Sequence, residues 1–139
     1  MNQAAVQIIL AVHGNLGQAL KESCYYFTGD SEHVKVCSLN EGEEIHEWER
    51  KLLSWVDSCP QTLILTDMLK ASTTVHASQA LRGRPDVELV TGVNLAMMVK
   101  AVQMASVWDV HRLARSIQET GKEDILYLRD KLGDAVEPE

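Results

Sequence analysis

Short apolar runs alternate along this chain with longer segments in which apolar residues recur every three or four positions. The first apolar run covers residues 6–12 and ends abruptly at His13 and Gly14. The apolar positions that follow are spaced as on one face of a helix, and they are Leu16, Leu20, Cys24 and Phe27. This pattern predicts a buried parallel strand, a tight turn and an amphipathic helix.

The same alternation continues through the rest of the chain. Further apolar runs predict strands over residues 34–39, 62–66 and 87–90. Apolar residues at helical spacing predict the intervening helices, and the residues expected to end helices are Pro60, Gly83 with Pro85, and Gly121. Residues 124–128 predict a fifth, edge strand, because Ile125, Leu126 and Leu128 are apolar. We expect one domain over residues 1–133, and a solvated tail or the start of a linker over residues 134–139.

Polar residues at the predicted helix starts indicate N-caps. Asn40 with Glu43, and Ser106 with Asp109, have the spacing of a capping box. Asn94 precedes another helix and can cap it. Ser72 and Thr73 are candidates for the same role at the start of the helix that carries Ala77, Ala80 and Leu81.

Strands that alternate with helices predict a parallel sheet covered by helices on both faces. We expect a doubly wound, mainly parallel α/β fold of the flavodoxin-like order 2-1-3-4, with the fifth strand antiparallel at an edge. In that order the switch point, where ligands bind, lies between the first and third strands. His13 and Asp67 directly follow those two strands. The sequence therefore predicts a histidine and a carboxylate side by side.

The predicted pair is suited to phosphoryl chemistry. A carboxylate that accepts a hydrogen bond from one ring nitrogen fixes the histidine tautomer and leaves the other nitrogen nucleophilic. The helix that begins after Gly14 presents free N–H groups and a dipole that favour phosphate. His13 is therefore a candidate acceptor of a phosphoryl group. The alternatives are a structural histidine at a strand end and, for Asp67, a helix cap or turn residue.

Composition narrows the class of protein. The chain has 139 residues, of which 45% are hydrophobic and 24% charged, as in an ordinary globular domain. The net charge of −7 argues against a nucleic-acid surface, because phosphate repulsion opposes association. No apolar run approaches the length of a membrane span, and the start of the chain lacks the features of a secretory signal. We therefore expect a cytoplasmic protein.

The metal-binding residue types show no recognisable motif. The cysteines are odd in number and lack metal-ligand spacing, which indicates reduced thiols; they are Cys24, Cys37 and Cys59. Four further histidines share no spacing with cysteines or carboxylates that specifies a metal site, and we expect them to be surface or half-buried; they are His33, His46, His76 and His111. The sequence predicts no metal and no other cofactor.

Three blocks of the chain resemble the sequence motifs of one known bacterial family. The first, His13-Gly14 after an apolar strand, resembles the family's phosphorylated histidine and its glycine. The second, Leu-Thr-Asp-Met-Leu-Lys-Ala-Ser over residues 65–72, resembles the family's Leu-Thr-Asp-Leu-Phe-Gly-Gly-Ser. The third, Val-Thr-Gly-Val-Asn-Leu-Ala-Met over residues 90–97, resembles Ile-Ala-Gly-Val-Asn-Leu-Pro-Met. The spacing between the blocks matches as well, and the chain therefore resembles the mannose-type IIA components of the bacterial phosphoenolpyruvate-dependent sugar phosphotransferase system.

The resemblance implies a phosphocarrier. A member of this family receives a phosphoryl group from the small carrier HPr and passes it to a IIB partner, which phosphorylates sugar taken up through membrane IIC and IID subunits. On the matching positions, His13 would be the acceptor and Asp67 would orient it. Gly14, Ser72 and Thr73, with nearby backbone N–H groups, would hold the phosphoryl oxygens. The resemblance also implies a homodimer that exchanges its last strand, here residues 124–128.

The chain departs from the family pattern in one loop. The family's Gly-Gly-Ser-Pro is replaced by Lys-Ala-Ser-Thr over residues 70–73. Glycine lets the backbone approach a phosphate closely, so its loss can tilt or narrow the loop. Lys70 can add a cation for phosphate, or it can be an ordinary solvated lysine.

Two functions therefore stay open. One is the phosphocarrier, and the other is a regulatory or binding module that keeps the fold but has weakened or lost phosphoryl transfer. A flavodoxin-like cofactor binder is less favoured, because no serine- and glycine-rich loop follows the first strand. The sequence does not specify the sugar.

Overall fold

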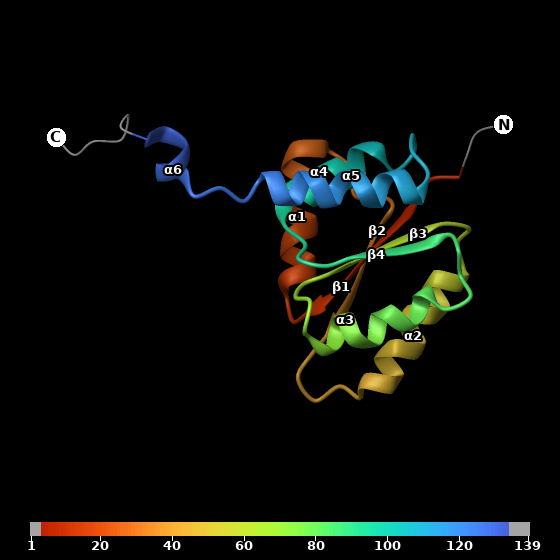
Figure 1. Ribbon diagram of the computed structural model, residues 1–139. Coiled ribbons are helices and arrows are strands. Elements are labelled where there is room, and N and C mark those ends of the chain that lie inside the picture. Colours follow the sequence, from red (N-terminus) through yellow and green to blue (C-terminus); the bar gives the residue numbers. More distant parts are fainter. Residues whose placement is uncertain (1–3, 134–139) are drawn as a thin grey trace.

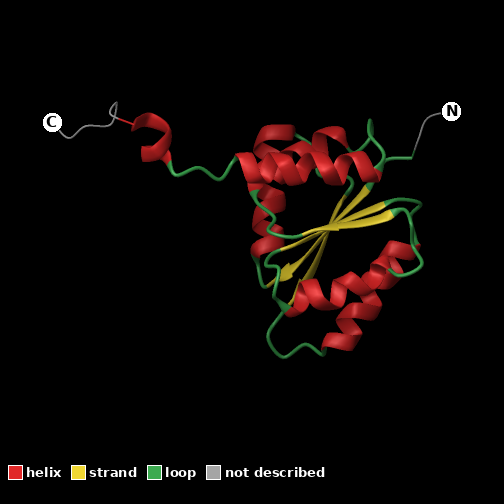
Figure 2. Cartoon of the chain, in the orientation of Figure 1, coloured by secondary structure: helices red, strands yellow, loops and turns green. Residues whose placement is uncertain are grey.

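The computed structural model describes residues 4–133, and it shows a four-stranded sheet between two layers of helices (Figures 1 and 2). The strands are β1 (Gln7–His13), β2 (Val34–Leu39), β3 (Thr62–Thr66) and β4 (Val87–Val90). They lie in the order β2-β1-β3-β4, and all neighbouring strands are parallel. The doubly wound α/β fold of order 2-1-3-4 is therefore confirmed.

The helices divide between the two faces of the sheet (Figure 1). One layer holds α1 (Leu16–Thr28), α4 (Leu95–Met104) and α5 (Val110–Glu123), and the other holds α2 (Ile45–Asp57), α3 (Ser72–Ala77) and the 3-10 helix η1 (Ser78–Leu81). A short helix, α6 (Leu128–Leu132), lies away from both layers. No helix within residues 4–133 is long and apolar enough to cross a membrane.

Alternate residues of β1 pack into two separate hydrophobic cores. Ile8 and Leu10 pack in the core on the side of α1, α4 and α5, whereas Ile9 and Ala11 pack in the core on the side of α2 and α3. All four side chains are fully buried. Burial on both faces explains why β1 is a continuous apolar run rather than an alternating one.

A glycine sets how closely α1 approaches the sheet beside the end of β1. A Cβ atom added at Gly17 would lie 2.5 Å from Cγ1 of Val36 and 3.0 Å from Cγ2 of Val12. Both neighbours are β-branched and stiff at χ1, so they cannot move aside cheaply. The absence of a side chain at Gly17 therefore keeps the first turn of α1 close to His13.

Two of the predicted helix caps are shifted in the structure. Asn94 caps α4 as predicted, because its Oδ1 accepts from the backbone N–H of Met97 at 3.0 Å. The cap of α5 is Asp109 rather than Ser106, and the cap of α2 is Glu44 rather than Asn40. In both wrong cases a carboxylate nearer the helix satisfies the free N–H groups, so the earlier polar residue lies in the preceding turn.

Two further predictions about helix ends are wrong. Ser72 and Thr73 do not cap α3, because the helix already begins at Ser72 and its N-cap is Ala71. Gly121 does not end α5, which continues to Glu123. Gly121 is instead a buried contact point: a Cβ atom there would lie 2.6 Å from the sulfur of Met97. The tight packing of α5 on α4 therefore accounts for this glycine.

The predicted fifth strand does not form in the single chain. Residues 124–127 leave α5 without regular structure, and α6 begins at Leu128. Their apolar side chains are exposed, with 76% of Ile125 accessible to solvent. A short apolar run cannot be assigned to strand or helix by periodicity alone, and here it has no neighbouring strand. The predicted tail over residues 134–139 lies outside the described residues.

The cysteines agree with the prediction of reduced thiols. None forms a disulfide, and Cys24 and Cys37 are buried. Burial raises the pKa of the Cys37 thiol to about 11. Because the thiolate is the reactive form, Cys37 is an inert core residue.

Candidate functional site

The sheet brings His13 and Asp67 together at its carboxyl edge. His13 is the last residue of β1, Asp67 follows β3, and these two strands are adjacent and parallel. Nδ1 of His13 lies 2.7 Å from Oδ2 of Asp67. The backbone N–H of His13 donates to the same oxygen at 2.9 Å. The carboxylate therefore holds both the backbone and the ring of the histidine.

The second oxygen of the carboxylate is held by the loop that follows β3. Oδ1 of Asp67 accepts from the hydroxyl of Thr73 at 2.7 Å and from the backbone N–H of Met68 at 2.9 Å. Burial alone would raise the pKa of Asp67, but the hydrogen bonds from His13, Thr73 and Met68 outweigh it and lower the pKa to about 2. Asp67 is therefore ionised at neutral pH.

This geometry assigns the two ring nitrogens of His13. An ionised carboxylate only accepts hydrogen bonds, so Nδ1 carries the proton and donates it. Nε2 then keeps its lone pair and is the nucleophilic nitrogen. The His13 side chain is 45% exposed, whereas that of Asp67 is 10% exposed. The arrangement is a largely buried orienting group beneath an accessible nucleophile.

The histidine opens onto a surface pocket of about 500 Å³. Two of its lining residues, Gly14 and Ser72, were predicted to bind phosphate. The remaining lining residues come from the end of β2, the loop that joins it to α2, the start of α2, and α3. They are Leu39, Asn40, Glu41, Glu43, Ile45 and His76. Two carboxylates on one wall oppose an approaching anion, so a partner that supplies positive charge is favoured there.

The other predicted phosphate ligands have different surroundings. Gly14 has a φ of 55° and its N–H donates to the Leu39 carbonyl at 3.0 Å, so it shapes the turn after β1. Thr73 is buried and its hydroxyl is directed to Asp67. Lys70 is exposed and makes no hydrogen bond or ion pair with the described part of the chain. Of the loop residues, Ser72 is the one whose exposed side chain lines the pocket with His13.

Sequence reasoning missed two threonine roles at this site. It treated Thr73 as a cap or phosphate ligand rather than a support for Asp67. It also did not single out Thr74, whose buried hydroxyl lies 2.6 Å from Oγ1 of Thr66 and 2.6 Å from the Met68 carbonyl. These contacts tie the start of α3 to the end of β3. The only signal in the sequence is that both threonines follow Asp67 within about two helical turns.

The structure is that of a doubly wound α/β protein with a histidine at the switch point of its sheet, held there by an aspartate. The sequence model of the family described as PTS system fructose IIA component (EIIA-man) matches residues 7–118. The chain therefore belongs to this family of phosphotransferase-system IIA components, and the resemblance seen in the sequence is confirmed. Membership connects the chain to phosphoryl transfer in sugar transport as a general role.

Solved structures share the fold. EIIA from Streptococcus agalactiae superposes with a TM-score of 0.81 at 22% identity, over 90% of this chain and 98% of that chain. The mannose/sorbose-specific IIA subunit from Enterococcus faecalis gives 0.80 at 22% identity, over 88% and 94%. A sigma-54 interaction domain protein from Enterococcus faecalis gives 0.75 at 16% identity, over 94% and 98%. At these identities the likeness establishes the fold alone.

Proposed function

We propose that this protein is a histidine phosphocarrier that accepts a phosphoryl group from HPr on Nε2 of His13 and passes it to a IIB component. The observation that carries the proposal is the pair formed by a half-exposed imidazole and a largely buried carboxylate on its Nδ1. As Nε2 attacks phosphorus, the bond between phosphorus and the donor breaks. The imidazole gains positive charge, and Asp67 stabilises that charge through the Nδ1 proton.

Groups around the pocket can bind the transferred phosphoryl oxygens. Ser72 lines the pocket, and its hydroxyl can donate a hydrogen bond. α1 begins at Leu16, after the short turn that follows His13, and its N-cap, Asn15, makes no side-chain capping bond. The N–H groups of the first turn of α1 and the dipole of a 13-residue helix favour an anion there.

The phosphocarrier proposal can be tested by reconstitution. The protein is incubated with phosphoenolpyruvate, enzyme I and HPr, and its mass is then measured before and after acid treatment. We expect one acid-labile phosphoryl group on each chain. A protein that stays unmodified while a known IIA component is phosphorylated under the same conditions would contradict the proposal. The proposed place in the cytoplasm and the indirect link to membrane IIC and IID subunits follow from it.

A regulatory or binding module with weakened transfer is the second candidate function. The observation that favours it is the loop over residues 70–73, where lysine and alanine replace two family glycines and the exposed lysine makes no hydrogen bond or ion pair with the described chain. The similarity to a sigma-54 interaction domain protein is compatible with this function, because it shows that proteins of different description use this fold.

Substitutions in this loop distinguish the two functions. If Lys70 assists phosphate binding, Lys70→Ala should slow phosphorylation of His13 modestly, since an exposed ammonium contributes on the order of 1 kcal/mol. The deficit should shrink at higher ionic strength because salt screens exposed charges. Initial rates of phosphoryl transfer from HPr at low and high salt measure both effects.

The double variant Lys70→Gly with Ala71→Gly is the matched comparison, because it restores the family's loop composition. If native transfer is efficient, this variant should match the wild type. If Lys70→Ala has no effect and the double variant is much faster, the native loop is impaired and the regulatory function is favoured. If only the glycine variant is phosphorylated, the carrier function is wrong for this protein.

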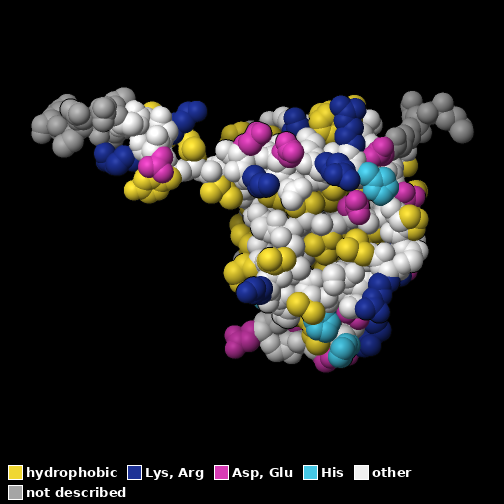
Figure 3. All heavy atoms as spheres, viewed as in Figure 1, with side chains coloured by type: hydrophobic (Ala, Val, Ile, Leu, Met, Phe, Trp, Pro, Cys, Tyr) yellow, Lys and Arg dark blue, Asp and Glu magenta, His cyan; other side chains and the backbone are white. Residues whose placement is uncertain are grey.

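We also propose that the protein is a homodimer that exchanges its C-terminal segment. β4 is an edge strand of the sheet, and a groove runs between it and α5; its lining includes Leu89, Val90, Ala114, Gly121 and Ile125. Figure 3 shows hydrophobic side chains over this edge, between the helical layers. The segment over residues 125–128 leaves the domain with its apolar side chains exposed. Adding this segment to the partner's β4 would cover both surfaces.

The dimer proposal predicts a single species of twice the chain mass in sedimentation at micromolar concentration. A truncated chain that ends at residue 123 should be monomeric, because it keeps the β4 edge but lacks the segment that would cover it. As a matched control, Tyr26→Ser removes an exposed apolar side chain from α1 and should leave the dimer intact. A monomeric full-length chain would contradict the proposal.

A further inference from the structure

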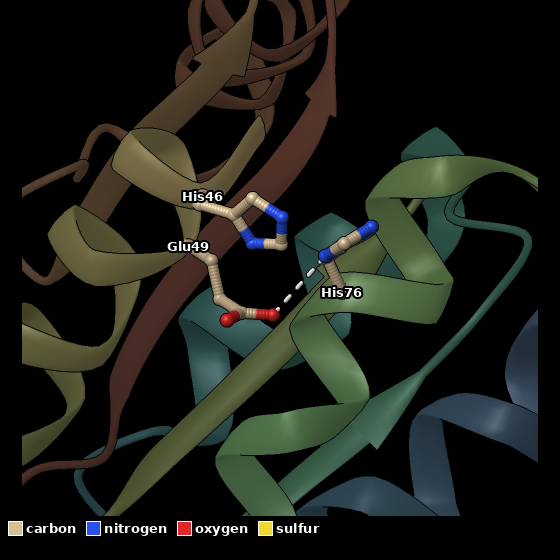
Figure 4. A group of neighbouring side chains, drawn as sticks. All are labelled: His46, Glu49 and His76. Atoms are coloured by element: carbon tan, nitrogen blue, oxygen red, sulfur yellow. Dashed lines mark hydrogen bonds and ion pairs between the residues drawn. The ribbon is translucent and has the colours of Figure 1, made fainter. Parts of the chain in front are cut away.

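Three side chains with metal-binding atoms meet between α2 and α3, on the side of the molecule that carries the pocket. They are His46 and Glu49 from α2 and His76 from α3 (Figure 4). One ligand atom from each of them lies within 4.8 Å of the other two. Nδ1 of His76 lies 3.1 Å from Oε1 of Glu49, and the ring centroids of the two histidines are 5.6 Å apart. Among residues 4–133 this is the one such cluster.

The fold fixes the backbone positions of all three residues. His46 and Glu49 are three positions apart on α2, so their side chains project from the same side of the helix. The first turn of α2 is held by the Glu44 cap, whose carboxylate accepts from the backbone N–H of His46 at 3.0 Å. α3 packs against α2 and is anchored to β3 by its threonines. The cluster is therefore produced by tertiary packing of two anchored helices.

We propose that His46, Glu49 and His76 bind one divalent transition-metal ion, with Zn²⁺ as the ion that fits best. Two imidazoles and one carboxylate form a ligand set that Zn²⁺ accepts, with the fourth position left to water. Zn–ligand bonds near 2.1 Å place tetrahedral ligand atoms about 3.4 Å apart. The 3.1 Å contact already meets this spacing, and small side-chain rotations bring the remaining atoms closer. Mg²⁺ and Ca²⁺ fit this ligand set less well, because they prefer oxygen ligands.

The side chains are accessible enough to take up an ion from solvent. His46 is exposed, and the side chains of His76 and Glu49 are 27% and 20% exposed. The bound ion would replace ring protons and the hydrogen bond between His76 and Glu49, and it would join α2 to α3. His76 also lines the pocket that holds His13. The ion would therefore stand at the wall of that pocket, although the proposal does not depend on phosphoryl transfer.

The test measures zinc binding by isothermal titration calorimetry, using the full chain without an affinity tag. We expect one zinc ion per chain for the wild type. Losing a residue that only supports a metal ligand costs about 10- to 100-fold in affinity, so His46→Ala and His76→Ala should each lose at least that much. His33→Ala is the matched control, because it removes an exposed histidine outside the cluster and should bind zinc as the wild type does.

Two further measurements distinguish zinc bound by these three residues from zinc bound by cysteines or elsewhere on the surface. The Co²⁺ form should show d–d bands of a low-coordinate site without thiolate charge transfer. Zinc at a concentration about a hundredfold above the dissociation constant should raise the Tm of the wild type by about 5 to 10 °C, and that of Glu49→Gln much less. Circular dichroism verifies that each variant is folded. The proposal would be overturned if the wild type did not bind zinc stoichiometrically. It would also be overturned if folded His46→Ala and His76→Ala bound zinc as tightly as the wild type.

Discussion

Replacement of His13 by alanine should abolish phosphorylation of this protein by phosphoenolpyruvate, enzyme I and HPr. Nε2 of His13 is the accessible nitrogen that the Asp67 carboxylate leaves unprotonated, and alanine offers no nucleophile in its place. We expect the acid-labile mass increase of the wild type to disappear completely. The variant should remain folded, because the His13 side chain is 45% exposed and makes no contribution to either core.

His33→Ala is the matched control for this experiment, since it removes another exposed histidine of the same chain. That variant should be phosphorylated at the wild-type rate. Full labelling of His13→Ala would show that a different residue accepts the phosphoryl group, and the proposed role of the pair at the switch point would then be wrong. Labelling of the wild type at His13 alone can be verified by peptide mass mapping at neutral pH.

Replacement of Asp67 by asparagine should slow phosphoryl transfer strongly while the fold is kept. The amide has the shape of the carboxylate, but it cannot stabilise the positive charge that the imidazole gains. The amide also no longer favours the His13 tautomer that carries its proton on Nδ1. Loss of the orienting carboxylate in a comparable histidine dyad costs about four powers of ten in rate, and we expect about two to four here. Single-turnover transfer from HPr measures the effect.

Thr73→Val is the matched comparison for the transfer rate of Asp67→Asn. That variant removes one hydrogen bond to Oδ1 of Asp67 but leaves the charge in place, so its rate should fall much less. Near-normal kinetics in Asp67→Asn would mean that Asp67 is a structural residue of the turn after β3. Equal losses in both variants would indicate that the position of the loop, rather than the charge, limits transfer.

Because the pKa of Asp67 is lowered, Asp67→Asn should also change how the unfolding free energy depends on pH. A carboxyl group whose pKa falls from 3.8 to about 2 on folding stabilises the native state by about 2 kcal/mol above pH 4. That contribution is lost as the pH falls through the folded-state value. The difference in unfolding free energy between wild type and Asp67→Asn should therefore narrow between pH 4 and pH 2. Denaturant titrations at several pH values measure it.

The two central strands, β1 and β3, were predictable because they are buried on both faces. Such strands must be continuous apolar runs, and the runs ended where the polar residues His13 and Asp67 begin. Alternation with helices then implied a parallel sheet, and the order 2-1-3-4 placed the two polar residues next to each other. The histidine–aspartate pair was therefore available from local patterns and a topological rule.

Caps and helix ends were less predictable because several local solutions compete. Asn40 with Glu43 and Ser106 with Asp109 both have the spacing of a capping box, but Glu44 and Asp109 are the residues that cap. Gly121 is a residue type that often ends helices, yet it lies inside α5, where a Cβ atom would meet the Met97 side chain of α4. Only the packing partner distinguishes a glycine that ends a helix from one that permits close contact.

By itself, the sequence determined the family, the sheet and the residues at its carboxyl edge, since burial and chain topology leave direct patterns in the order of residues. Tertiary structure alone decided the finer chemistry. It directed Thr73 to Asp67, left Lys70 exposed without a hydrogen bond or ion pair to the described residues, and brought His76 to both the pocket and the His46–Glu49 pair. It also left residues 124–128 exposed rather than in a strand. These features depend on which elements pack together, and periodicity within one segment carries no information about its neighbours in space.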